Sequence, residues 1–534
     1  MKLSGLLSSL ALSASAVTAR RSLQHVGHVA DRLGQRQKAP AEPRSTLEYA
    51  DKSTNSSWKY LTDKTKKFVV DGSAIPDVDF DVGESYAGLI PLGNSTTDEF
   101  YFWFYPSTNK DKAVDDEILI WLNGGPGCSS LEGILQENGP FTWQYGTYKP
   151  IENPYSWHRL TNVVWIEQPV GTGFSPGTPT AQDEEDIAEQ FKAFWKNFVD
   201  TFDLQNRKVY ITGESYAGMY VPYIASSFLD TNDTTYFDVD GILIYDPSIA
   251  YDYLQGSVTA VPFVDSNIAL FPLDSDDLAT YRALDVECGF ADFRNKYLTY
   301  PPPGVLPGPD DLPGLDNETC SELYDNIYDS VNIKNPCFDI YQVATTCPVL
   351  WDVLGFPGSF NYLPEGAQIY FNRTDVQTAI NAPHISWSSC SDEDVFPNGD
   401  SSLPSAITVL GSVIDRTQNV VVAHGLLDFV LIAEGTLLAI QNTTWGGLQG
   451  FQSAPTGDFV IPAHNDYSDS TLAAAGILGK TITERGLTWV TVELSGHMIP
   501  QYQPSAAFRQ LEFLLGRVDS LNSTKPFTVN VATV

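Results

Sequence analysis

The chain has 534 residues, of which 43% are hydrophobic and 12% aromatic, so it can bury a large core. Its formal net charge of −35 at pH 7 argues against nucleic acid as a partner, because phosphate groups would be repelled. Such acidity is compatible with simple solubility, or with an acidic compartment in which carboxylates are protonated and repel one another less.

The N-terminus has the features of a secretory signal. Lys2 is followed by an apolar run, and Val17 and Ala19 suit the −3 and −1 positions of a signal-peptidase site, so residues 1–19 are expected to be removed. Residues 20–45 are basic and polar and are interpreted as a propeptide or a disordered leader. Because no later run of about 18 apolar residues occurs, no membrane anchor is expected. Secretion to the outside is the first expectation, and vacuolar delivery is the alternative.

If the chain is secreted, its cysteines can form disulfides and its N-x-S/T sequons can be glycosylated. The six cysteines allow three disulfides in any of fifteen pairings, and none has the spacing of a zinc site. They are Cys128, Cys288, Cys320, Cys337, Cys347 and Cys390. The sequons predict N-glycosylation at Asn55, Asn94, Asn232, Asn317, Asn372, Asn442 and Asn522.

Along the chain, strand-like runs alternate with helix-like segments. Strands are expected at residues 117–122, 163–166, 208–212, 241–245, 419–423 and 488–494, and helices at 182–202, 221–229 and 503–515. This alternation predicts an α/β fold, with a mostly parallel central sheet that helices cover on both faces.

The middle of the chain interrupts this alternation. Residues 253–405 contain four of the six cysteines and a proline-rich stretch, and they show no clear strand pattern. We expect them to form a disulfide-stapled insertion, or lid, between two core segments at 46–252 and 406–520. Residues 521–534 are expected to form a C-terminal tail.

The hexapeptide Gly-Glu-Ser-Tyr-Ala-Gly occurs twice, and its context indicates which copy holds a nucleophile. Ser215 follows the apolar run 209–211 and precedes a helical segment, which is the strand–turn–helix arrangement of a nucleophile elbow. Ser85 follows an alternating stretch and leads toward Pro91, which is typical of a hairpin strand. Ala217 replaces the last glycine of the general G-x-S-x-G pattern, and a small residue there still suits a tight turn. Ser215 is therefore the expected nucleophile.

A nucleophilic serine needs a base and an acid that orients the base. In α/β-hydrolases the chain order is Ser, Asp or Glu, then His. His497 follows the strand at 488–494 through a short turn, and Asp428 lies just past the strand at 419–423. Asp415 precedes that strand and fits less well. Ser215, Asp428 and His497 are therefore the expected triad.

The oxyanion hole has a candidate in the glycine-rich run after the strand at 117–122. Glycines there allow the backbone to approach a reacting group closely. The backbone N–H groups of Gly125 and of Tyr216, the residue after the nucleophile, are the expected donors.

Four segments are characteristic as a set. They are Trp-Leu-Asn-Gly-Gly-Pro-Gly-Cys-Ser-Ser at 121–130, Ile-Glu-Gln-Pro-Val-Gly-Thr-Gly-Phe-Ser at 166–175, Gly-Glu-Ser-Tyr-Ala-Gly at 213–218 and Gly-His-Met-Ile-Pro at 496–500. Together they resemble the serine carboxypeptidases, and the resemblance spans about residues 75–515. The resemblance implies an α/β-hydrolase fold and a fungal secreted or vacuolar enzyme that releases C-terminal amino acids at acidic pH. No cofactor is implied.

The resemblance also implies how the substrate is held. Asn123, Glu137 and Glu214 correspond to residues that bind the substrate's terminal carboxylate. A glutamate can hydrogen-bond a carboxylate only when a proton is shared between them. Trp121 would shield this group, and Met498 would line the pocket of the leaving residue.

For the cysteines, the resemblance implies a Cys128–Cys390 disulfide, with the other four paired inside the insertion, either nested or in sequence.

An acyltransferase on the same fold, or a non-catalytic binding protein, remains as an alternative function.

Overall fold

The residues that the computed structural model describes are 58–312, 314–355, 367–464 and 473–531. The expected signal at 1–19, the expected leader at 20–45 and the sequon at Asn55 lie outside them. Within these ranges, no helix is long and apolar enough to cross a membrane.

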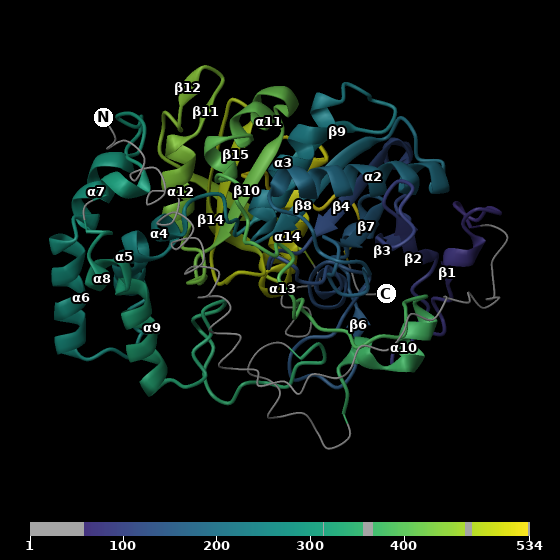
Figure 1. Cartoon of the computed structure of the whole chain (residues 1–534), viewed down its shortest axis with the longest axis horizontal. Helices are drawn as coiled ribbons and strands as arrows, with labels where there is room; N and C mark the ends of the chain where they lie inside the picture. The colour runs from purple at the N-terminus through teal and green to yellow at the C-terminus, as the bar shows by residue number, and fades with distance from the viewer. Residues whose placement is uncertain (1–57, 313, 356–366, 465–472, 532–534) are drawn as a thin grey trace, which may run out of the picture.

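An 11-stranded sheet forms the centre of the protein, in the order β1-β2-β3-β7-β4-β8-β9-β10-β15-β14-β13 (Figure 1). Its strands are β1 (Val69–Val70), β2 (Ser85–Pro91), β3 (Glu99–Tyr105), β4 (Glu117–Leu122), β7 (Val163–Glu167), β8 (Lys208–Glu214), β9 (Asp238–Tyr245), β10 (Val420–Gly425), β13 (Gly457–Ile461), β14 (Gly476–Glu484) and β15 (Leu487–Val492). Two short hairpins stand apart from it, β5 (Phe141–Thr142) with β6 (Ile151–Glu152), and β11 (Thr444–Trp445) with β12 (Leu448–Gln449).

The centre of the sheet is parallel and its two edges are antiparallel. From β7 through β4, β8, β9 and β10 to β15, each neighbouring pair runs parallel. Outside them, neighbouring strands run antiparallel. Between β14 and β15 the chain reverses in a tight hairpin at Arg485 and Gly486, where both residues have positive φ. The parallel centre matches the expected fold class. Apart from β2, where a hairpin strand was expected at Ser85, the antiparallel edges add strands that the sequence pattern had not indicated.

Two apolar cores lie on opposite faces of the sheet. Residues of β4 alternate between them, since Ile118 and Ile120 belong to one core and Leu119 and Trp121 to the other. The first core includes α2 (Glu184–Phe202), α3 (Ala217–Asp230) and α11 (Leu410–Thr417), and the second includes α14 (Pro504–Leu514).

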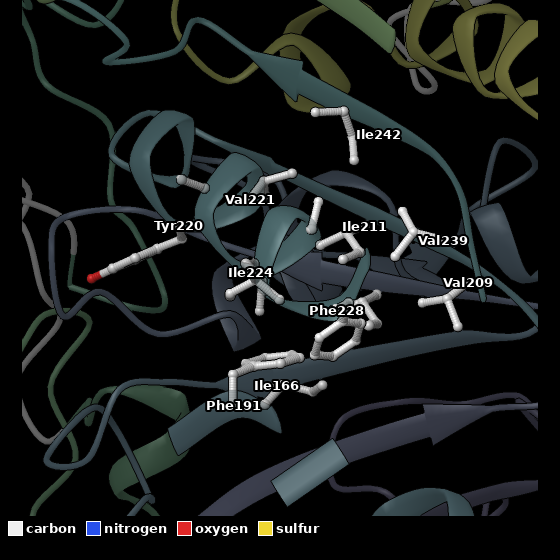
Figure 2. Packing of buried hydrophobic residues seen from close by; sticks show 14 of the residues in the cluster. Ile166, Phe191, Val209, Ile211, Tyr220, Val221, Ile224, Phe228, Val239 and Ile242 are labelled. Carbon is white, nitrogen blue, oxygen red and sulfur yellow. The ribbon is translucent and has the colours of Figure 1, made fainter. Parts of the chain in front are cut away.

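Helix α3, which follows the expected nucleophile, packs directly on the sheet. Figure 2 shows Val221, Ile224 and Phe228 of α3 gathered with Val209 and Ile211 of β8. Each fully buried side chain of this kind contributes about 1.5–3 kcal/mol of transfer free energy. This packing holds the turn between β8 and α3 in place.

The insertion is largely helical and has its own small core. Its helices are α4 (Asp252–Gln255), α5 (Ser257–Ser266), α6 (Ser275–Glu287), α7 (Phe290–Tyr297), α8 (Glu318–Ser321), α9 (Leu323–Lys334) and α10 (Thr374–Ala379). In Figure 1, α5 to α9 gather to one side of the sheet. Phe429 and Ile432, which lie between β10 and α12 (Ala433–Asn442), pack into this small core. The exact limits of the insertion stay predictions.

Three disulfides staple the insertion. Cys128 is joined to Cys390, Cys288 to Cys320, and Cys337 to Cys347. The last two pairs are therefore arranged in sequence and not nested. Cys128 and Cys390 also form a backbone bridge, so the chain near the end of the insertion is fixed to the loop after β4.

Candidate active site

Ser215 stands on a sharp turn between β8 and α3. Its φ of 61° lies in the left-handed region, which a non-glycine residue adopts only where the surroundings hold it. Its N–H donates to the Tyr245 carbonyl of β9 at 2.9 Å, and its carbonyl accepts from the Ser248 N–H at 2.9 Å. Gly213 has no room for a side chain, because an added Cβ would lie 2.4 Å from the Leu122 carbonyl oxygen. This geometry is that of a nucleophile elbow.

Ser85, in the second copy of the hexapeptide, lies in β2. It is fully buried and accepts a hydrogen bond from Trp103 Nε1 at 3.2 Å. Its strand pairs antiparallel with β3 and continues to Pro91, so no helix follows the serine. The structure therefore gives the two identical hexapeptides different local folds.

Asp428 and His497 meet at the carboxyl ends of β10 and β15. Asp428 Oδ2 lies 2.8 Å from His497 Nδ1, and both residues are buried. Asp428 Oδ1 also accepts the Val430 N–H at 2.8 Å, which fixes the carboxylate. The loops carrying them are joined as well, since the Leu427 N–H donates to the Ser495 carbonyl at 2.8 Å.

The other ring nitrogen of the histidine is available for chemistry. His497 Nε2 is buried and has no hydrogen-bond partner among the described residues. Burial lowers the pKa of His497, but the charge of Asp428 and its hydrogen bond raise it by more, so the net shift is upward. The arrangement leaves one nitrogen oriented by an acid and the other free to accept a proton.

The glycine-rich loop after β4 lies directly against the elbow. A Cβ added to Gly124 would come within 2.4 Å of the Tyr216 backbone nitrogen and 2.9 Å of Ser215 Cβ. Gly125 has a φ of 111°, which suits glycine alone. Within the described chain, neither the Gly125 N–H nor the Tyr216 N–H has a hydrogen-bond acceptor. Two free backbone donors beside a serine suit the binding of an oxyanion.

Asn123 joins two buried glutamates beside this loop. Its Nδ2 donates to Glu137 Oε1 at 3.1 Å and to Glu214 Oε1 at 2.9 Å. Its Oδ1 accepts from Trp121 Nε1 at 2.7 Å, which sets the orientation of the amide. Glu137 ends the short π-helix η3 (Gly133–Glu137), and Glu214 immediately precedes Ser215. The strand ends and η3 thus bring together three residues that are far apart in sequence.

Burial keeps these two carboxyls protonated at acidic pH. Desolvation raises the pKa of Glu137 to about 7, and desolvation together with the charge of Glu137 raises the pKa of Glu214 well above its usual range. Glu137 Oε2 and Glu214 Oε2 are both buried without a hydrogen-bond partner in the described structure. A pair of this kind can share protons with an incoming carboxylate.

Met498 and Trp121, the two expected pocket residues, are both buried. Met498 is buried directly after His497, at the start of α13 (Ile499–Tyr502). Trp121 is fully buried, and its ring meets that of Trp157 edge-on at 5.1 Å. Gly133 is needed there, since an added Cβ would lie 2.1 Å from Trp121 Nε1.

A second Asp–His pair, which the sequence pattern did not indicate, lies behind the first. Asp246 Oδ1 is 2.9 Å from His424 Nδ1 and also accepts the Gly425 N–H at 2.8 Å. Burial and the nearby charge of Asp428 raise the pKa of Asp246, while burial lowers that of His424 to about 4, so both shifts favour the uncharged forms of the pair. The sequence feature that could have indicated this pair is the position of Asp246 directly after the strand β9.

Ligand atoms of Asp246, Asp428 and His497 lie within 4.8 Å of one another. A metal ion there would compete with the Asp428–His497 hydrogen bond, which already uses one atom of each residue. The arrangement is therefore better suited to orienting the histidine than to binding a metal.

Comparisons with known proteins show what the whole chain is similar to. The family model described as "Serine carboxypeptidase" matches residues 76–516. A probable serine carboxypeptidase of Arthroderma benhamiae is 51% identical over 96% of this chain and 97% of its own length. The serine-type carboxypeptidase F of Aspergillus niger is 44% identical over 97% of this chain and 99% of its own length.

Among solved structures, a prohormone-processing carboxypeptidase from Saccharomyces cerevisiae shares the fold. The TM-score is 0.67 at 22% identity, and the match covers 86% of this chain and 98% of the other.

Proposed function

Since the chain belongs to the serine carboxypeptidase family and is an enzyme that hydrolyses peptides from their C-terminus, we propose that Ser215, His497 and Asp428 perform the acyl transfer. His497 Nε2 takes the proton from Ser215 Oγ as the oxygen attacks the last peptide carbonyl carbon. The N–H groups of Gly125 and Tyr216 stabilise the oxyanion. His497 then gives the proton to the leaving amine, and water hydrolyses the ester on Ser215 by the same steps.

The exopeptidase specificity is proposed to come from Asn123, Glu137 and Glu214, and the observation that carries this is the hydrogen-bonded bridge between the two buried carboxyls. Glu214 is the residue before the nucleophile, so a carboxylate bound there lies close to the reacting carbonyl. The terminal carboxylate accepts from the Asn123 amide and shares the protons of the glutamates. An internal peptide segment offers no carboxylate and leaves those groups unpaired.

Binding should therefore weaken as the pH rises. Below about pH 7 Glu137 keeps its proton, because burial raises its pKa to about 7. Above that pH, each further unit should raise KM for a blocked dipeptide by about tenfold, because the ionised carboxyl repels the substrate's carboxylate. The measurement is KM from pH 4 to 8. Glu137→Gln serves as the matched variant. Its amide does not titrate, so the rise of KM with pH should be smaller than in the wild type. A wild-type KM that is constant over the whole range would contradict the proposal.

The chemical step has the opposite dependence. The net shift in His497 is upward, so its ring becomes protonated and loses its function as a base as the pH falls. We therefore expect kcat to fall toward acidic pH while KM stays low. The composition suggested operation at acidic pH. The expected pH dependence of KM supports this, and the expected pH dependence of kcat does not.

Secretion with glycosylation is also proposed, on the signal-like residues 1–19. Four sequons lie on the exposed surface of the described chain, at Asn94, Asn232, Asn317 and Asn522. Asn442 is half-buried and its Oδ1 accepts the Leu306 N–H. Asn372 is the poorest acceptor, because its side chain is hydrogen-bonded in both directions to the Trp387 backbone. Extracellular delivery is preferred to vacuolar delivery.

A further inference from the structure

Glu132 is a buried carboxyl beside the active site for which the mechanism has no use. Its side chain is 6% exposed, and among the described residues it has neither a hydrogen bond nor an ion pair. It immediately precedes η3, and the Gly133 N–H that follows it donates to Asn123 Oδ1 at 3.3 Å. An unpaired acid in such a position costs free energy unless a ligand supplies a partner.

Glu132 lies beside the two glutamates joined by Asn123, since the residue after it is hydrogen-bonded to that asparagine. It is close enough to Glu137 and Asp352 for their charges to add to the effect of burial and raise its pKa, and its own charge acts on Glu214. Asp352 Oδ1 accepts from Gln136 Nε2 at 2.5 Å, so this acid is held against η3.

The insertion supplies another acid to the same region. Asp339 lies in the loop closed by the Cys337–Cys347 disulfide, and it accepts the Tyr341 N–H at 2.9 Å. The Tyr341 carbonyl accepts the His497 N–H at 2.8 Å, and the two rings lie 5.2 Å apart. The disulfide loop therefore places Asp339 next to the catalytic histidine.

Three tyrosines lie near these acids. Charges of Glu132 and Asp339 both act on three half-buried tyrosines from different segments, which are Tyr145, Tyr341 and Tyr502. Aromatic walls suit the long aliphatic stem of a lysine or arginine and attract its charge.

Within the part of the chain that the structure describes, no lysine or arginine is among the groups that shift the pKa of Glu132, Asp339, Glu137 or Glu214. The one cation that acts on any of them is protonated His497, which affects Glu137 and Asp339.

We propose that Glu132, with Asp339 and Asp352, forms the pocket for the side chain of the leaving residue, and that this pocket selects substrates ending in lysine or arginine. The inference rests on the proposed function, because the terminal carboxylate must be held at Asn123 for the adjoining side chain to reach Glu132. The ammonium or guanidinium group then pairs with the Glu132 carboxylate, and the stem lies along the tyrosine rings.

The preference should depend on pH. Burial raises the pKa of Glu132 well above its usual range, so a bound cation competes with a proton for this carboxyl, and the competition favours the cation more as the pH rises. The groups around Glu132 that also titrate are Glu137, Glu214, Asp339, Asp352 and the three tyrosines. Titration of the Asn123-bound glutamates acts on the terminal carboxylate of every substrate, and this effect cancels when two substrates are compared. The charge of Glu137 also raises the pKa of Glu132, and that effect remains in the comparison.

The test compares two blocked dipeptides that differ only in ending with lysine or with norleucine, which has the same stem without the amine. We expect the ratio of their kcat/KM values to favour lysine and to rise between pH 5 and 7. Glu132→Gln should lower that ratio at least about tenfold, the range of one charge-assisted hydrogen bond. Glu287→Gln, which removes an exposed carboxylate on α6, should leave the ratio unchanged.

The outcomes separate the two proposals. If the wild type releases neither residue, the proposed function fails. If it releases norleucine but never prefers lysine, or if Glu132→Gln leaves the ratio unchanged, the acidic pocket is overturned and the carboxypeptidase assignment stands. Should Glu132→Gln fail to fold, the wild-type ratio of kcat/KM for lysine and norleucine still tests the proposal. A ratio that does not rise between pH 5 and 7 would overturn the acidic pocket.

Discussion

Ser215→Ala is expected to lower kcat/KM for a blocked dipeptide by a factor on the order of 10⁶, because removal of the nucleophile ends acyl-enzyme formation. Residual turnover would come from the oxyanion donors and from binding alone. The measurement is the rate of amino-acid release by purified, folded variant protein.

The chain offers an unusually close control, because Ser85 lies in an identical hexapeptide. Ser85→Ala removes the hydroxyl that accepts from Trp103 Nε1, so it should cost about 1 kcal/mol of stability. It should leave kcat/KM unchanged, since Ser85 is buried in β2. Loss of activity in Ser85→Ala with its folding intact, or retention of activity in Ser215→Ala, would overturn the assignment.

Asp428→Asn is expected to lower kcat by about 10⁴-fold with little change in KM. The asparagine amide would donate toward Nδ1 where the carboxylate now accepts at 2.8 Å, so the ring would adopt the wrong tautomer for taking the serine proton. Steady-state kinetics measures both constants.

Asp415 provides the matched control for this substitution. It precedes β10, is exposed on α11, and accepts the Gly446 N–H at 2.6 Å. Asp415→Asn should leave kcat unchanged. A large fall in kcat from Asp415→Asn, with none from Asp428→Asn, would mean that the orienting acid is Asp415, before β10, and not Asp428, after it.

Local patterns were enough to predict the parts of the site that follow strands. Ser215, Asp428 and His497 each stand just beyond an apolar run, and parallel strands bring such positions to one edge of a sheet. The same rule separates the two hexapeptides, because only one is followed by helical periodicity. Asn123, Glu137 and Glu214 depended on the family resemblance, since no periodicity marks Glu137 as facing the site.

Other parts depend on contacts that sequence patterns do not report. Asp246 and His424 are distant in sequence and meet only because β9 and β10 are neighbours. Asp339 reaches the histidine through a loop whose disulfide pairing could be nested or sequential before the structure was known. The outer strand β14 contains glycines and exposed polar residues, so its apolar pattern is too weak to predict a strand.

The central claim is that this enzyme recognises a free terminal carboxylate through Asn123 and its two buried glutamates. The most direct test compares a blocked dipeptide with its C-terminal amide at pH 4.5, with Ser215→Ala as the blank. We predict faster release of the last residue from the free acid than from the amide, and neither reaction in Ser215→Ala. Equal hydrolysis of acid and amide would contradict carboxylate recognition, and no hydrolysis of either would instead favour acyl transfer or a binding role.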